Sequence, residues 1–154
     1  MPVKRLKEFL DSRQVKYLAI NHSLAYTAQE IAASTHIPVN RLAKTVMVKI
    51  DGEMAMAVVP GSDKVDLDLL KQAAGAKKVE LASELEFKDR FPECAIGAMP
   101  PFGNLYAMEV FAASNLPADE IAFNAGSHTE LIRMSYKDFE SLIQPKIAGL
   151  SGAR

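Results

Sequence analysis

The sequence predicts a single α+β domain in which helices pack outside a mixed β-sheet, and three observations lead to this prediction. The chain has 154 residues, which is the usual size of one domain. Segments with helical periodicity and segments with strand alternation follow one another without a regular β-α-β order. Two strand-like runs flank Asp51-Gly52, a dipeptide typical of a tight hairpin turn. No repeat, linker or low-complexity stretch divides residues 1–154, so one domain is expected.

The N-terminal third is expected to alternate between helices and strands. Apolar residues three and four apart predict a helix over 2–13, and a short strand is expected over 17–20. The sequence of residues 27–30 is a capping-box pattern, which predicts the start of a second helix. A helical turn over 38–43 is expected to lead into a strand that ends at Ile50, because side chains alternate there between apolar and polar.

The middle of the chain has equally clear local signals. A strand over 54–60 is expected to complete the hairpin. Asp66 is placed to cap the following helix, and Gly75 is placed to end it. A strand over 78–81 and a second capping-box pattern at 83–86 come next.

The C-terminal part is expected to supply the remaining strands and a last helix. Strands are predicted over 105–111, 121–124 and 130–134. Ser135 is placed to cap a helix that Pro145 ends.

Composition bounds the class of protein. Hydrophobic residues make up 49% and charged residues 24%, as in ordinary globular proteins. The longest apolar run, 54–60, is far too short to cross a membrane. The N-terminal segment is charged and lacks the apolar stretch of a signal peptide, so a cytoplasmic location is expected.

Several kinds of site are excluded by the residues that they would need. The single cysteine, Cys94, allows no disulfide within the chain and no cysteine-based zinc site. The three histidines, His22, His36 and His128, fit no metal-binding spacing. Neither a phosphate-binding P-loop nor a zinc deaminase signature is present. We therefore expect no metal and no cofactor.

Charge is distributed unevenly along a chain whose net charge is −1. Residues 1–50 carry eight Lys or Arg and three Asp or Glu, whereas residues 51–154 carry ten and sixteen. This asymmetry permits a basic face on an otherwise acidic protein. The first helix, with Lys4, Arg5 and Lys7, is one candidate for that face; Arg41 and Lys49 are the alternative.

Three segments stand out from this background. Lys44 follows an apolar pair at the start of a strand, where its ammonium needs water or a partner, and a lysine that reaches into solvent is the structural alternative. Residues 97–103 (GAMPPFG) form a stiff, turn-prone loop, and residues 123–128 (FNAGSH) run from a strand into a glycine turn. On pattern alone, each loop is also compatible with an ordinary turn.

Together, these segments resemble the YbaK-like aminoacyl-tRNA deacylases, relatives of the editing domain inserted in bacterial prolyl-tRNA synthetases. The resemblance rests on A-K-T at 43–45, the G-x-x-x-P loop at 97–101 and F-N-A-G at 123–126, in this order and spacing. It covers roughly residues 22–145. It implies a strongly curved mixed sheet around a pocket, with helices packed outside.

The resemblance also implies a function. The chain would be a trans-acting hydrolase that removes a small amino acid from mischarged tRNA. Its partner would be the 3′ aminoacyl-adenosine end of tRNA, with an aminoacyl-tRNA synthetase as a further candidate; neither DNA nor a membrane is expected. A non-catalytic module that binds aminoacyl-tRNA or a nucleotide is the alternative. A small-molecule esterase is less favoured, because no nucleophile–base pair is visible.

Catalysis is assigned to Lys44 and Gly97 by this resemblance. An aminoacyl ester is already activated, so the enzyme needs to place a water and stabilise the oxyanion. An ordinary lysine pKa of about 10.4 makes Lys44 a poor base, so its expected role is electrostatic, on a terminal phosphate or the ester carbonyl. Backbone N–H groups of Gly97, Ala98 and Met99 are expected to bind the carbonyl. The base stays open between a substrate hydroxyl, a water and His128.

The remaining expectations concern the substrate. Tyr26 and Phe102 could stack on the terminal adenine, although aromatic residues more often simply pack. A wall of small or apolar groups, Ala125 included, without an acidic residue predicts that alanine, serine, threonine or cysteine esters enter and large aromatic ones do not. The expected substrate-binding residues are His22, Tyr26, Thr45, Met47, Ala98, Met99, Pro101, Phe102, Asn124, Gly126 and His128.

Overall fold

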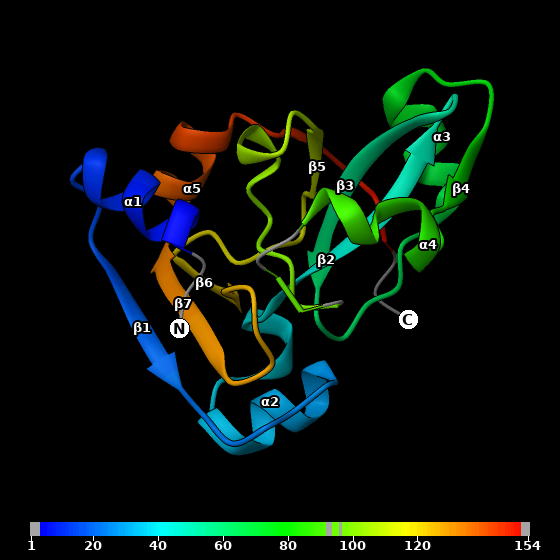
Figure 1. The fold of residues 1–154 in the computed structure, drawn as a ribbon. Helices are drawn as coiled ribbons and strands as arrows, with labels where there is room; N and C mark the ends of the chain where they lie inside the picture. The colour runs from blue at the N-terminus through cyan, green and yellow to red at the C-terminus, as the bar shows by residue number, and fades with distance from the viewer. Residues whose placement is uncertain (1–3, 92–93, 96, 152–154) are drawn as a thin grey trace.

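Over residues 4–91, 94–95 and 97–151, which the computed structural model of the protein describes, the chain forms two β-sheets with helices packed around them (Figure 1). The helices are α1 (Lys4–Ser12), α2 (Ala28–Thr35), α3 (Leu67–Ala74), α4 (Glu84–Phe87) and α5 (Tyr136–Ile143). The strands are β1 (Tyr17–Asn21), β2 (Ala43–Ile50), β3 (Glu53–Pro60), β4 (Val79–Leu81), β5 (Glu109–Ala113), β6 (Glu120–Asn124), β7 (Glu130–Ser135) and β8 (Lys146–Ala148). Short 3₁₀ turns cover Val39–Arg41, Lys88–Arg90 and Gly103–Leu105.

The larger sheet is built around the hairpin of β2 and β3, in the strand order β4-β2-β3-β5-β8. The hairpin runs from the turn at Asp51-Gly52 to an open end where Ala43 lies opposite Pro60. The predicted hairpin is thus confirmed, and Lys44 lies near its open end, opposite Val59. β3 pairs in parallel with β5, and β5 in parallel with β8, so the sheet is mixed.

The smaller sheet has the order β1-β7-β6 and is antiparallel throughout. It meets the larger sheet at a parallel bridge between Leu42 and Ala122. α2 lies at this lower end of the molecule, and α1 and α5 lie at the upper end (Figure 1). The α+β class is confirmed; the strands are divided between two sheets, and the bridge at Leu42 is the link between them.

Local capping chemistry sets the helix ends where the sequence predicts them. The Thr27 hydroxyl accepts from the Glu30 N–H, and the Glu30 carboxylate accepts from the Thr27 N–H, each at 3.1 Å. Asp66 caps α3 by accepting from two N–H groups of its first turn, and Gly75 ends the helix. These contacts satisfy backbone groups that have no partner inside the helix.

Two features near the C-terminal half differ from expectation. The strand expected over 105–111 begins only at Glu109, because the Gly103 carbonyl accepts from the N–H groups of Tyr106 and Met108 and so closes a compact turn. β8 was not predicted; it has three residues and follows Pro145 directly. Three residues are too few to show the alternation of apolar and polar side chains that marks a strand. β8 is a strand because it pairs with β5.

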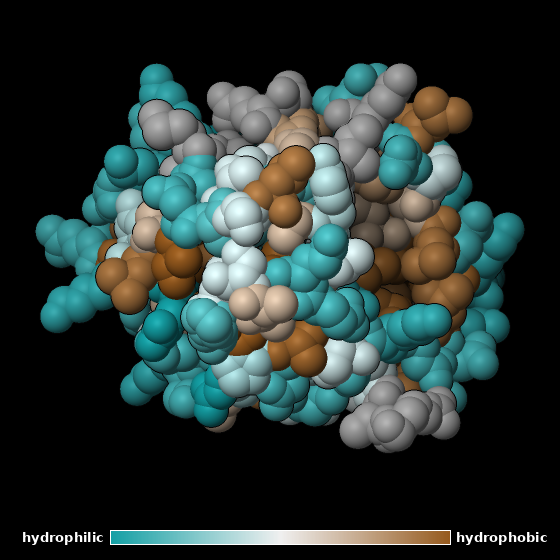
Figure 2. All heavy atoms as spheres, turned by 90° about the horizontal axis from the view of Figure 1, so that it is seen from below, coloured by the Kyte–Doolittle hydropathy of each residue, from teal (hydrophilic) through white to brown (hydrophobic). Residues whose placement is uncertain are grey.

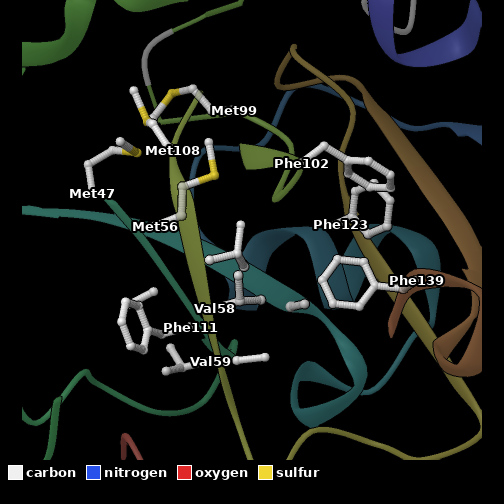
Figure 3. Close-up of a cluster of buried hydrophobic side chains, with 14 of the residues drawn as sticks. Met47, Met56, Val58, Val59, Met99, Phe102, Met108, Phe111, Phe123 and Phe139 are labelled. Atoms are coloured by element: carbon white, nitrogen blue, oxygen red, sulfur yellow. The ribbon is translucent and has the colours of Figure 1, made fainter. Parts of the chain in front are cut away.

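The main core takes side chains from both sheets and from the helices packed on them (Figure 3). In Figure 3, Met47, Met56, Met99 and Met108 gather in one part of this core, and the rings of Phe102, Phe123 and Phe139 gather in another, apart from Phe111. Phe102 contacts Phe123 and Phe139 at ring-centroid distances of 5.4 and 5.9 Å, geometries typical of favourable aromatic pairs.

A smaller apolar cluster lies beside α2, around Ile31, Leu42, Ala122 and Leu131. Figure 2 shows this end of the molecule from below: hydrophilic residues cover much of the face, and hydrophobic residues border a hollow on the side that carries α3, α4 and β4. Within the described part of the chain, none of the helices has the length and apolar character needed to cross a membrane.

Candidate active site

A pocket of about 440 Å³ lies where the open end of the β2–β3 hairpin meets β6 and the first turn of α2. This volume is within the range of small-molecule sites. Part of its wall is apolar and comes from the cluster of Ile31, Leu42, Ala122 and Leu131 beside α2. The rest is polar and comes from the start of β2, the loop after β3, and β6.

Lys44 projects from the second position of β2 into this pocket and is partly buried. Among the described residues, no hydrogen-bond acceptor or carboxylate pairs with its ammonium at contact distance. Burial lowers the pKa of Lys44 below its ordinary value, the charge of Asp63 opposes this effect, and the charge of Lys64 adds to it. The pocket therefore holds a cationic group that is available to a ligand.

Asp63, on the loop after β3, lines the same pocket. Its Oδ2 accepts hydrogen bonds from Asn115 Nδ2 at 2.9 Å and Ser151 Oγ at 2.8 Å, and its Oδ1 accepts one from Ser62 Oγ at 3.3 Å. Burial raises the pKa of Asp63, but these donors and the charge of Lys44 outweigh it, so the pKa lies below its ordinary value. Asp63 is therefore a carboxylate at neutral pH.

Gly97 is the point where the GAMPPFG loop reaches the pocket. Its φ of +87° lies in the region that favours glycine, and a Cβ there would be 3.6 Å from His128 Cε1. The loop is held against the Gly126 turn by two backbone hydrogen bonds, from Ala95 N–H to the Gly126 carbonyl (2.8 Å) and from Gly126 N–H to the Ala98 carbonyl (2.9 Å). Two segments distant in sequence thus fix the position of Gly97.

The donors of this loop are fewer than expected. The Ala98 N–H already donates to the Ala95 carbonyl at 3.0 Å, so it is not available to a substrate. The N–H groups of Gly97 and Met99 have no acceptor among the residues that the structure describes. Of these two, only Gly97 lines the pocket.

Tyr26 lines the pocket near Gly97, and His128 contacts Tyr26 from outside the pocket lining. Their rings contact each other at a centroid distance of 4.7 Å, and Tyr26 lines the pocket with 65% of its surface exposed. The His128 carbonyl accepts from the Ala25 N–H at 3.1 Å, which ties the start of α2 to this turn. An exposed aromatic ring at a pocket mouth is available for stacking with a base.

Asn124 Oδ1 and His22 Nε2 are buried side-chain atoms without a hydrogen-bond partner among the described residues. Asn124 lines the pocket from the end of β6, so its carbonyl oxygen can accept from a ligand. His22 lies outside the pocket lining. Its Nδ1 lies 2.7 Å from the Ser23 carbonyl oxygen, so Nδ1 carries the proton and donates to it.

The structure brings some of the expected site residues together and not others. Tyr26, Lys44, Thr45, Gly97 and Asn124 line the pocket. Gly126 and His128 support Gly97 from behind. The expected apolar wall is different: Met47, Ala98, Met99, Pro101, Phe102 and Ala125 are buried, away from the pocket lining. The side chains after Gly97 turn into the core, where Phe102 packs on Phe123, and the Gly103 carbonyl accepts from the Met108 N–H.

Sequence reasoning missed the loop after β3, which contributes Gly61, Ser62, Asp63 and Lys64 to the pocket. The signal was present in the hairpin: a two-residue turn fixes the register, so residues just after β3 must lie beside the start of β2. Gly61 is needed there, since a Cβ would lie 2.8 Å from the Val39 carbonyl oxygen. Asp63 adds to the pocket an acidic side chain that the motif stretches themselves do not contain.

The candidate basic residues are largely occupied by protein partners. Arg5 donates to the Leu105 carbonyl at 2.8 Å. Arg41 pairs with Asp119 at 2.7 Å, and Lys49 pairs with Glu86. Lys4 and Lys7 are exposed on α1. In the described part of the chain, no three His, Cys, Asp or Glu side chains are grouped so that they could hold a metal ion.

Comparisons with known proteins agree with this geometry. A family model described as the aminoacyl-tRNA editing domain matches residues 22–142. The multifunctional Ser/Thr-tRNA deacylase ProXp-y of Escherichia coli K12 is 25% identical over 150 residues, 94% of this chain and 89% of that protein. The proline–tRNA ligase of Bacillus mycoides is 30% identical over 84 residues, 54% of this chain but 15% of that enzyme. A solved structure described as a candidate trans-editing enzyme for prolyl-tRNA synthetase has the same fold, with a TM-score of 0.83 at 21% identity over 98% of this chain and 97% of that one.

Proposed function

This chain belongs to the aminoacyl-tRNA editing domain family, and we propose that it is a deacylase that hydrolyses the ester of tRNAs mischarged with a small amino acid. The observation that carries the proposal is Lys44. The Lys44 ammonium is partly buried and faces a pocket of suitable size, and none of the carboxylates that the structure describes is paired with it. Such an arrangement is unfavourable for folding alone and is useful when a negative charge arrives or develops there.

Lys44 and Gly97 would act on the ester carbonyl. When water attacks the carbonyl carbon, negative charge develops on the carbonyl oxygen, and a cation and an N–H donor near that oxygen stabilise the transition state. Collapse of the tetrahedral intermediate breaks the bond to the ribose oxygen, which takes up a proton and leaves as the hydroxyl. Lys44 can alternatively bind the phosphate of the terminal nucleotide, because a fixed positive charge stabilises the phosphate as well as the developing charge on the carbonyl oxygen.

The proton of the attacking water would go to a substrate hydroxyl, a second water or His128. His128 lies behind Gly97 and contacts Tyr26, outside the pocket lining. This position suits a residue that supports the loop better than one that reaches the water. We therefore propose that a ribose hydroxyl or a water takes the proton and that His128 positions Gly97.

Tyr26, Thr45 and Asn124 would hold the rest of the substrate. The Tyr26 ring is exposed at the mouth, where it can stack on the terminal adenine. Asn124 Oδ1 needs a donor, which a ribose hydroxyl or an amino group of the substrate supplies. His22 would keep the β1–α2 connection in place, through its N–H bond of 2.8 Å to the Thr129 carbonyl.

The amino acid accepted would be small. A pocket of about 440 Å³ must hold the aminoacyl group and part of the terminal adenosine. Alanine residues 28, 43 and 122 form part of its wall, and a pocket of fixed size discriminates mainly by excluding what is too large. The printed name of the E. coli relative makes serine and threonine the first esters to test.

The rival function is a module that binds aminoacyl-tRNA without hydrolysing it. Deacylation rates of alanyl-, seryl-, threonyl- and phenylalanyl-tRNA decide between the two. We expect hydrolysis of the small esters and little of the phenylalanyl ester. Binding without hydrolysis of any ester would establish the rival, and equal rates for all esters would remove the size-exclusion account.

The partner would be the 3′ aminoacyl end of tRNA in the cytoplasm. Few phosphates are within reach of a domain of this size, so tRNA binding would be weak and sensitive to salt. A synthetase is a further candidate partner, because relatives include a segment of proline–tRNA ligase. Co-sedimentation of this chain with tRNA and with prolyl-tRNA synthetase would test both.

A further inference from the structure

Asp63 is the single acidic side chain among the described residues that line the pocket. Two cationic side chains, Lys44 and Lys64, line it with Asp63. The pocket therefore has two positive charges and one negative charge. The preference for a small amino acid follows from the pocket volume alone and leaves the role of these charges open.

The contacts of Asp63 fix its carboxylate without neutralising it. All three donors, Ser62, Asn115 and Ser151, are uncharged groups. By contrast, Asp119, Glu120 and Glu86 are paired with an arginine or a lysine within the ion-pair distance. The donors to Asp63 come from three separate segments, so its position is held by tertiary structure. A fixed carboxylate that keeps its charge is a ready site for a cation.

The proposed substrate carries charges that complement this set. An aminoacyl-adenosine end has a phosphate anion on one side of the ribose and an α-ammonium on the amino acid. A lysine can take the phosphate or the carbonyl oxygen, and Asp63 is then the group left for the ammonium. An α-amino group has an ordinary pKa of about 7.7–8.0, so much of it is charged at neutral pH.

We propose that the Asp63 carboxylate binds the α-ammonium of the aminoacyl group, and thereby selects esters with a free amine over esters whose amine is blocked or absent. This inference rests on the proposed function. It deepens that function by assigning a separate subsite to the part of the substrate that all α-amino acids share. The editing site would then recognise the class of substrate through Asp63 and the size of the side chain through the apolar wall.

Two amide-linked analogues of the substrate end test the subsite without requiring turnover. One is 3′-alanylamino-3′-deoxyadenosine, and the other has a lactyl group, in which a hydroxyl replaces the ammonium at nearly the same size. We expect wild-type protein at pH 6.5 to bind the alanyl analogue about 10-fold more tightly, the effect of one charge-assisted hydrogen bond. The preference should shrink as the pH rises through the pKa of the α-amine.

Asp63→Asn removes the charge and keeps one acceptor oxygen, which can still accept from Asn115 and Ser151. We expect this variant to lose the preference, through weaker binding of the alanyl analogue with the lactyl analogue unchanged. Asp68→Asn is the matched control, since Asp68 is exposed on α3 outside the pocket lining and should retain the full preference. Thermal unfolding of both variants reports any loss of fold.

The proposal is overturned if wild-type protein binds the two analogues equally, or if Asp63→Asn weakens both to the same extent. The second result would make Asp63 a residue that positions Lys44 or the loop. Failure of the proposed function looks different. In that case alanyl-tRNA is not hydrolysed, while the analogue preference and its dependence on Asp63 persist.

Discussion

Two lysines on the same strand, Lys44 and Lys49, have opposite environments. Lys49 lies toward the closed end of the β2–β3 hairpin and pairs with Glu86; this hydrogen bond raises the pKa of Lys49 and lowers that of Glu86 to about 2. Lys44 lies at the open end, where burial lowers its pKa and no carboxylate pairs with it among the described residues. The Lys49 ammonium is paired with a carboxylate of the protein, whereas the Lys44 ammonium faces the pocket, where we propose that it meets the substrate.

The different environments of Lys44 and Lys49 follow from what completes each end of the hairpin. The closed end of the hairpin is completed by β4 and α4, which supply the partner of Lys49. The open end is completed by loops, which supply Gly97 and Asp63 and leave a pocket. Functional residues commonly lie on loops that a rigid scaffold positions, and here the same strand serves both ends.

The largest expected effect is on turnover when Lys44 is changed. Lys44→Ala should reduce single-turnover deacylation by about 100-fold or more, because charge stabilisation at the reacting centre is lost. Lys49→Ala is the matched control and should change the rate by no more than about 2-fold, since an exposed ion pair contributes little. Similar losses in both variants would remove the distinction between the two ends of the hairpin.

A smaller effect is expected at the loop that faces Lys44. Gly97→Val places a branched side chain at a φ of +87° and next to His128, so both the loop and the approach of the ester suffer. We expect about a 10-fold loss of rate, with a far-ultraviolet circular dichroism spectrum like that of the wild type. If the rate falls only in proportion to the fraction unfolded, Gly97 is merely a turn residue.

The pKa shifts of the two lysines have opposite signs, so the pH dependence of the rate distinguishes them. The pKa of Lys44 is lowered by burial, so its charge, and with it the catalysed rate, should be lost at a lower pH than an ordinary lysine would give. The pKa of Lys49 is raised, so its ion pair with Glu86 persists through the same range. Rates corrected for uncatalysed hydrolysis between pH 6 and pH 10 check this. A catalysed rate that does not fall in the alkaline range would contradict the role of Lys44.

The smallest effect is expected on tRNA affinity. Changing Lys4, Arg5 and Lys7 together to Glu should weaken binding a few-fold at low salt, with less effect at high salt, if α1 is the RNA-binding face. Arg5 already binds the Leu105 carbonyl and contacts the Tyr106 ring at 5.4 Å, so part of any effect is structural. Filter binding at two salt concentrations separates the contributions. Unchanged affinity would move the face to Arg41 and Lys49.

The parts of the fold that the sequence predicts correctly are those that local chemistry determines. Asp51-Gly52 defines its turn from two residues, and Thr27 with Glu30 defines a helix start from four. The division into two sheets and the three-residue strand β8 depend on pairing between distant segments. The alternation of apolar and polar residues within one segment does not show which distant segment it pairs with.

The site divides in the same way. Lys44, Gly97 and Asn124 are found from their motifs, because each sits at the end of a strand or at a glycine turn. Met99 and Phe102 follow Gly97 closely, yet they turn into the core, since nearness in sequence does not set the direction of a side chain. Asp63 lies nineteen positions from Lys44 and comes beside it through the hairpin register.

The central claim is that the charge of Lys44 is held for the substrate and not for the fold. The most direct test is Lys44→Met, measured both by single-turnover deacylation and by urea unfolding. The sign follows from the lowered pKa: the folded state binds the Lys44 proton less well than the unfolded state, so the charged lysine disfavours folding at neutral pH. We predict a rate lower by about 100-fold with a free energy of unfolding equal to or above that of the wild type. A variant that keeps its turnover, or that loses activity only because it unfolds, would contradict the claim.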